Sequence, residues 1–137
     1  MNDIVKILPN FKKFNDYISN VKNNTNPIML SGLTDSGTVH FAYSTYFYAE
    51  KPICIITYNE LQAKKIIRNL EYFENNINYF PKKEILAYDY LAESKDITYS
   101  RIACLNEIHK KQAKIIVTTI EAVSQKIIPE DVLYKNI

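Results

Sequence analysis

The residues of this chain best suited to chemistry lie in one loop, SGLTDSGTVH, at positions 31–40. Gly32 and Gly37 are separated by four residues, the spacing with which phosphate-binding loops wrap backbone N–H groups around phosphate oxygens. The sequence contains no other glycine, so we expect this loop to need unusual backbone conformations. The polar side chains between and beside the two glycines are Asp35, Ser36 and Thr38.

The residues that would act on a bound nucleotide are missing from this loop. Thr38 and Val39 stand where a working loop has its lysine and its magnesium-binding hydroxyl residue. Asp35 places a negative charge where an anion would be held. No apolar stretch ends in an Asp-Glu pair able to act on magnesium and water. We therefore expect no catalytic residue and no metal site, and we favour a structural turn over a weak anion site.

The elements around the loop follow from the hydrophobic pattern. Apolar residues at helical spacing predict an N-terminal helix at about 10–22 and further helices after the loop, after Asn59 and after Thr98. Short apolar runs predict buried strands at 27–30, 52–58, 77–80 and 114–119, and a short helix precedes Pro129. Strands that alternate with helices predict a doubly wound, mostly parallel sheet. The segment 82–96 has no clean period, and we expect it to wrap the surface.

Composition limits the class of protein. The 137 residues are 47% hydrophobic and 23% charged, which is typical of one globular domain, with the core expected at about 27–130. A net charge of +2 is too balanced to indicate nucleic-acid binding by itself. Two distant cysteines predict buried free thiols, and no apolar run reaches the ~20 residues needed to cross a membrane. We expect a cytoplasmic protein, and a fragment of a longer one, with no membrane partner.

A block at 80–101, FPKKEILAYDYLAESKDITYSR, followed by IIVTTIEAVSQKIIP, resembles the N-terminal region of bacterial transcription-repair coupling factors. The matching features are Phe80-Pro81, a Tyr-Asp pair, Asp-Ile, a Ser-Arg pair that opens a helix, and an apolar strand that runs into a short helix ending in Pro129. The stretches SGLTDSGTVHFAY and PICIITYNELQAKK fit the same register, so the resemblance covers about 27–130.

This resemblance implies a fold and a function. The family's N-terminal module is similar to the first domain of the excinuclease protein UvrB, a three-layer α/β fold of P-loop NTPase and helicase type. In the family the loop is degenerate, and ATP-driven translocation on DNA, with ATP and magnesium, belongs to a motor elsewhere in the chain. The implied role is non-catalytic support for recruiting nucleotide excision repair to stalled RNA polymerase. The excinuclease protein UvrA, the polymerase and DNA would bind outside this segment, which would contact other domains of its own chain. The alternative is a nucleotide-binding subdomain of an ATPase or helicase of the UvrB type.

Polar residues at two strand ends are further candidates. They are Thr57, Tyr58 and Asn59 after the second predicted strand, and Thr118 and Thr119 after the fourth. The carboxyl ends of parallel strands are where ligands gather, and in helicase-type folds these positions resemble contacts to the DNA backbone. The simpler interpretation is that Asn59 caps a helix and the threonines satisfy loop backbone groups, and we favour it because nothing basic accompanies them.

A second candidate group is structural. Asp89, Asp96 and Arg101 are predicted to form an ion-pair network that pins the long loop, because a guanidinium fork pairs well with carboxylates.

Overall fold

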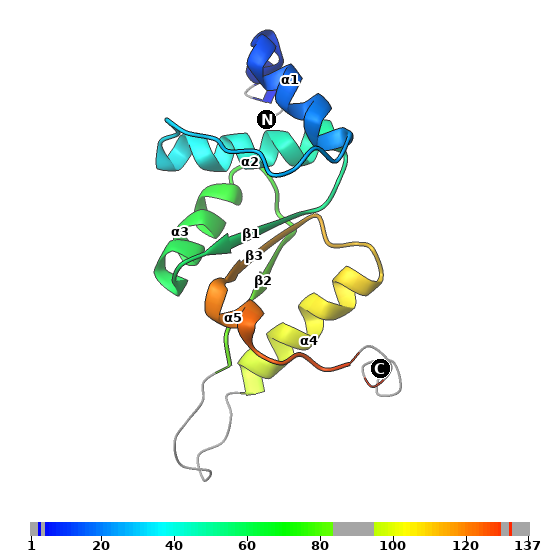
Figure 1. Ribbon diagram of the computed structural model, residues 1–137. Coiled ribbons are helices and arrows are strands. Elements are labelled where there is room, and N and C mark those ends of the chain that lie inside the picture. The colour runs from blue at the N-terminus through cyan, green and yellow to red at the C-terminus, as the bar shows by residue number, and fades with distance from the viewer. Residues whose placement is uncertain (1–2, 4, 84–94, 130–131, 133–137) are drawn as a thin grey trace.

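The computed structural model describes residues 3, 5–83, 95–129 and 132, and its centre is a three-stranded parallel sheet. The strands are β1 (Ile53–Thr57), β2 (Ile77–Phe80) and β3 (Ile115–Thr119), in the order β1-β3-β2. In the register, Ile53 and Ile77 both lie opposite Ile115, so all three carboxyl ends reach the same edge of the sheet. The expected parallel α/β sheet flanked by helices is therefore present (Figure 1).

Helices surround this sheet in the order that the hydrophobic pattern predicts. The N-terminal part has a 3-10 helix η1 (Val5–Asn10) and α1 (Lys12–Lys22); then come α2 (Asp35–Ala49), α3 (Glu60–Leu70), α4 (Lys95–His109) and α5 (Ile120–Ser124). The predicted N-terminal helix and the cap of α3 by Asn59 are confirmed. No helix in the described part of the chain is long and apolar enough to span a membrane.

The core lies on both faces of the sheet. Successive strand residues point to opposite faces, so one strand supplies two separate clusters. The larger cluster joins η1, α2 and α3 to β3 through Val5, Val39, Tyr43, Ala63, Leu70, Ile115 and Val117. The smaller cluster joins α4 and α5 to the opposite face through Phe80, Cys104 and Ala122. Figure 1 shows the same arrangement, with α2 and α3 on one side of the strands and α4 and α5 on the other.

The prediction of a strand at 27–30 is wrong. This segment forms no strand, and Met29 is 92% exposed and Leu30 45% exposed. A four-residue apolar run can form a strand only if a neighbouring strand pairs with it, and no described strand does so. The loop therefore follows a segment without regular secondary structure, and the strand–loop–helix context of a phosphate loop is absent.

The face of the sheet that packs against α4 and α5 is also less completely covered than predicted. Strand β1 was expected to be buried on both faces, but Cys54 and Ile56 are exposed, because α4 and α5 pack over β2 and β3. The prediction of two buried thiols therefore holds for Cys104 alone. On α4 the buried residues are Arg101 and Cys104, whereas Ile108 is exposed.

Candidate functional site

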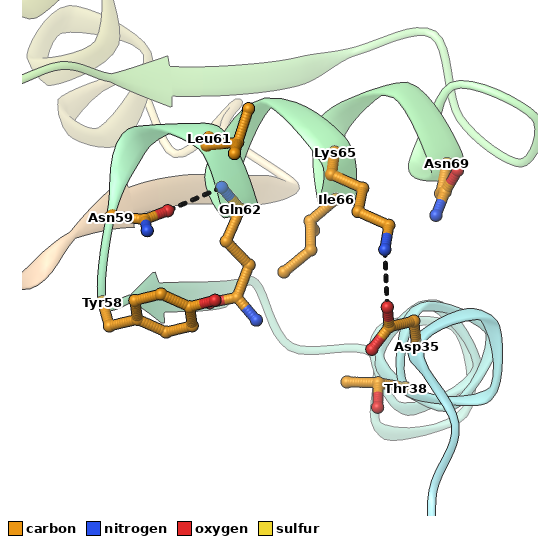
Figure 2. Close-up of a pocket in the computed structure, with 9 residues that line it drawn as sticks. All are labelled: Asp35, Thr38, Tyr58, Asn59, Leu61, Gln62, Lys65, Ile66 and Asn69. Carbon is orange, nitrogen blue, oxygen red and sulfur yellow. Dashed lines mark hydrogen bonds and ion pairs between the residues drawn. The ribbon is translucent and has the colours of Figure 1, made fainter.

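The two predicted site regions meet in one pocket between the N-terminus of α2 and the helix α3 (Figure 2). Its volume is about 260 Å³. Asp35 and Thr38 come from the former phosphate loop, and Tyr58 and Asn59 come from the end of β1. The remaining walls are side chains of α3, namely Leu61, Gln62, Lys65, Ile66 and Asn69. The geometry of this pocket determines what the loop can bind.

The first turn of α2 is capped by the protein itself. Thr34 is the N-cap, and its Oγ1 accepts a hydrogen bond from the backbone N–H of Gly37 at 3.2 Å. The carbonyl oxygen of Thr34 accepts hydrogen bonds from the N–H of Thr38 at 2.8 Å and from the Oγ1 of Thr38 at 3.0 Å. A phosphate held at a helix N-terminus depends on unpaired N–H groups there. Here the N–H groups of Gly37 and Thr38 already have partners.

Both glycines of the loop have a role that involves no ligand. Gly32 has a φ of 79°, a left-handed conformation that residues with a Cβ rarely adopt. Gly37 lies inside the first turn of α2, where an added Cβ would meet Oγ1 of Thr34 at 3.0 Å. The expected unusual backbone is therefore found at Gly32, while Gly37 gives room for the cap. Ser36, the remaining loop residue, is exposed, and its Oγ lies 3.5 Å from Oγ1 of Thr34.

Position 39 is turned away from the loop. A working phosphate loop places a Ser or Thr hydroxyl at this position, next to magnesium. Val39 is 2% exposed and belongs to the larger core cluster. A hydroxyl here would lie among apolar side chains, so the geometry as well as the residue type is unsuited to metal binding.

The pocket carries one cation and one carboxylate, and these are paired. Lys65 Nζ lies 2.6 Å from Oδ2 of Asp35, as the dashed line in Figure 2 marks. Through this hydrogen bond and its charge, the Lys65 ammonium holds the pKa of Asp35 below its usual range, and Asp35 raises the pKa of Lys65. The described walls of the pocket are therefore neutral overall, which gives little attraction for a polyphosphate.

Most of the strand-end candidates make contacts inside the fold. Oγ1 of Thr57 donates to the carbonyl oxygen of Thr118 at 3.0 Å, and Oγ1 of Thr118 donates to that of Phe80 at 2.9 Å. Oγ1 of Thr119 accepts from the N–H of Ala122 and so caps α5. All three threonines are buried, which favours the structural interpretation.

The other two strand-end candidates lie at the pocket. Asn59 caps α3, because its Oδ1 accepts a hydrogen bond from the N–H of Gln62 at 2.8 Å. Tyr58 is 70% exposed. Contact of these residues with DNA stays a prediction.

The proposed ion-pair network is not seen among the described residues. Asp89 lies outside them, and Arg101 forms no ion pair with Asp96. The two residues are five positions apart on α4, so they leave the helix in different directions. Arg101 instead donates from Nη1 to the carbonyl oxygen of Pro81 at 2.6 Å. It therefore holds the backbone at Pro81 through a carbonyl acceptor.

Sequence reasoning did not identify Lys65 as part of the site. Its partner Asp35 is thirty positions away, and only the packing of α2 on α3 brings the two together. The available signal was helical spacing, since Leu61, Lys65 and Asn69 recur every four residues and line one side of the pocket.

Metal chemistry has no support in the described part of the chain. No three His, Cys, Asp or Glu side chains there lie close enough together to hold a metal ion.

One comparison with known proteins gives a match. The chain is similar to the transcription-repair-coupling factor of Bacillus subtilis (strain 168), with 22% identity over 134 residues. The match covers 96% of this chain and 11% of that protein, so the chain spans about a tenth of the relative's length. No protein-family model matches the sequence, and no solved structure matches it.

Proposed function

We propose that this chain is a non-catalytic α/β subdomain of a transcription-repair coupling factor. In this proposal it supports recruitment of the nucleotide excision repair machinery to stalled RNA polymerase. Nearly the whole chain, 96%, aligns with a protein of that name, and the Pro-Tyr-Asp and Ser-Arg block lies within the aligned region. ATP, magnesium and DNA would act on a motor outside these residues. The excinuclease protein UvrA and the polymerase would likewise bind elsewhere in the longer chain.

The proposal that the subdomain is non-catalytic rests on the contacts made at the N-terminus of α2. Thr34 caps the helix, Asp35 is paired with Lys65, and Val39 is in the core. Each of these three contacts works against nucleotide binding: the cap occupies the N–H of Gly37, the ion pair neutralises the charge of Lys65, and the side chain at position 39 has no hydroxyl for magnesium.

A nucleotide-binding subdomain of the UvrB type is the alternative. The left-handed Gly32 and the pocket of about 260 Å³ beside Thr38 favour it. Titration with Mg-ATP followed by thermal unfolding distinguishes the two. A ligand at a hundredfold excess over its dissociation constant stabilises a protein by about 2.7 kcal/mol. We expect no shift in Tm, and a saturable rise would contradict the non-catalytic assignment.

The repair role needs a separate test in cells. Codons 27–130 would be deleted in frame from the gene, and removal of ultraviolet damage would be followed on the transcribed and non-transcribed strands. We expect the faster repair of the transcribed strand to be lost while repair of the other strand continues. Unchanged strand preference, with the truncated protein present at normal level, would contradict the proposed role.

A further inference from the structure

Strand β1 lies at an edge of the sheet, and no described strand lies on its outer side. The N–H of Ile53 donates to the carbonyl oxygen of Lys114, so the backbone groups of Ile53 point toward β3. Because these groups alternate in direction along a strand, those of Cys54 and Ile56 point away from β3. They form no hydrogen bond with another described residue. This edge therefore presents two N–H groups and two carbonyl groups that lack protein partners in the described part of the chain.

The side chains beside this edge are apolar and exposed on one face of the sheet. Cys54 is exposed and Ile56 is 55% exposed, because α4 and α5 pack over β2 and β3 and leave β1 uncovered. Ile120 begins α5 directly after β3, the strand that pairs with β1, and is also exposed. Val123 lies one helical turn later and is exposed as well. Apolar surface and unpaired backbone groups thus occur together at β1.

Strand β1 lacks the features that usually keep an edge strand from pairing with another chain. Such edges are commonly protected by a charged residue or a proline within the strand. The strand sequence ICIIT contains neither. The net charge of the chain is only +2, so two copies would repel each other weakly. Strand β2, at the other edge, has side chains that are half-buried or buried, and it contacts both α3 and α4.

The strand is also complementary to itself. When a second copy lies antiparallel with Ile55 on the two-fold axis, Cys54 lies opposite Ile56 of the second copy. These are the residues whose backbone groups point outward, so each pair can exchange two hydrogen bonds across the contact. The remaining pair, Ile53 with Thr57 of the second copy, adds no charge. A contact of this symmetry closes after two copies.

We propose that the outer edge of β1 is a docking surface for a second copy of this chain. The β1 strand of the second copy adds in antiparallel orientation, so the two sheets become one continuous sheet. The unpaired backbone groups select a strand as the occupant, and the exposed side chains of Cys54 and Ile56 select an apolar one. Ile120 and Val123 extend the apolar surface beside the contact. This pairing does not depend on the proposed repair function, since it needs only the strand and its neighbours.

Sedimentation velocity of the 137-residue chain over a range of concentrations tests the pairing. A reducing agent is present, so that the exposed Cys54 cannot form a disulfide between copies. We expect a monomer–dimer equilibrium that depends on concentration. Amide hydrogen exchange is a second readout, because the N–H groups of Cys54 and Ile56 should exchange more slowly as the dimer forms. The N–H of Ile55 faces β3 and should change little.

A matched pair of variants tests the position of the contact. Ile56→Lys places a charge on the edge at an exposed position and should raise the dissociation constant of the dimer about tenfold or more. Ile7→Lys makes the same change at a position on η1 that is 51% exposed, and it should leave the association unchanged. Thermal unfolding of both variants checks that each one folds.

Four outcomes would overturn the proposal. If the chain stays monomeric at every concentration, a second copy is not the occupant of this edge. If association appears only without reducing agent, a disulfide at Cys54 and not a strand pair joins the copies. If Met29→Lys abolishes association and Ile56→Lys does not, the exposed segment 27–30 is the contact. If species larger than a dimer form, the pairing does not close by two-fold symmetry.

Discussion

Lys65 Nζ lies 2.6 Å from Oδ2 of Asp35, so α3 supplies a cation to the N-terminus of α2, whose own loop contains none. The pair crosses the pocket that joins the former phosphate loop to the end of β1. A carboxylate at the first turn of a helix is favoured by the helix dipole, and here it also has a positive partner. The anion at this helix terminus is therefore part of the protein itself.

The first prediction concerns the ionisation of Asp35. In Lys65→Met the pKa of the Asp35 carboxyl should rise toward its ordinary value, because the hydrogen bond and the positive charge that lower it are removed. A ¹³C NMR titration of the carboxyl carbon measures this. The control is Lys64→Met, which breaks the neighbouring ion pair with Glu60 and should leave Asp35 unchanged.

The same pair contributes to stability in a defined range of pH. The folded-state pKa of Asp35 lies below its unfolded value, so its contribution is present above the unfolded pKa and is lost as pH falls through the folded one. Both residues of the pair are exposed, so the effect should be small and should weaken with added salt. An Asp35 pKa that is identical in the wild type and in Lys65→Met would show that the contact does not persist in solution.

The second prediction concerns the strand-end threonines. Thr118 is 1% exposed, and its hydroxyl donates to the carbonyl oxygen of Phe80 on the neighbouring strand. Thr118→Val keeps the side-chain shape but leaves that buried acceptor without the donor, so the free energy of unfolding should fall by about 1–2 kcal/mol. Urea denaturation measures the change, and Thr25→Val, at an exposed position, is the control. A stability change no larger than that of Thr25→Val would refute the structural role.

Local pattern predicted most of this fold because most elements carry their own signal. Helix α3 has a capping residue and an apolar stripe, and strands β1, β2 and β3 are short apolar runs bounded by polar residues or proline. The segment 27–30 has the same kind of apolar run but no described strand beside it, and pairing is a non-local property. The prediction there failed because four apolar residues do not specify their neighbour.

The site was harder to predict for a related reason. Glycine spacing identified the loop, but Lys65 lies on α3 and reaches the same pocket only because α2 and α3 are in contact. Arg101 was expected to pair with carboxylates, and its burial over Phe80 could not be read from hydropathy, which places arginine outside. Residues whose roles depend on packing between distant segments leave no local signal in a single sequence.

The third prediction concerns Cys104 of α4, which is buried in a cluster with Phe80 and Ala122. Burial, and secondarily the charges of Cys54 and Glu107, raise the pKa of its thiol to about 11 from an ordinary value of 9.0. Between these two values the unfolded chain loses this proton and the folded chain keeps it, so stability falls as pH rises. The slope of the Cys104 contribution should be steepest midway between the two pKa values, at about 1 kcal/mol per pH unit, and should fade about one pH unit below the unfolded pKa.

Urea denaturation of the wild type and of Cys104→Ala across pH 8–11 isolates this contribution. The variant loses stability at every pH because a buried sulfur is removed, but its slope above pH 9 should be shallower than that of the wild type. Removal of the exposed thiol in Cys54→Ala should change the slope less. Parallel curves for the wild type and Cys104→Ala would show that the thiol titrates alike in both states.

The fourth prediction asks whether the lost loop chemistry can be restored. Thr38→Lys returns a lysine to the position where a working loop has one, yet we expect no rise in Tm with Mg-ATP. The N–H of Gly37 is still bound to Oγ1 of Thr34, and Asp35 still carries its negative charge. Adding Val39→Thr should lower the free energy of unfolding by about 1–3 kcal/mol, because it buries a hydroxyl in the core, and should still give no nucleotide binding. A saturable Tm increase in Thr38→Lys would mean that the loop retains a working phosphate cradle and lacks only its lysine.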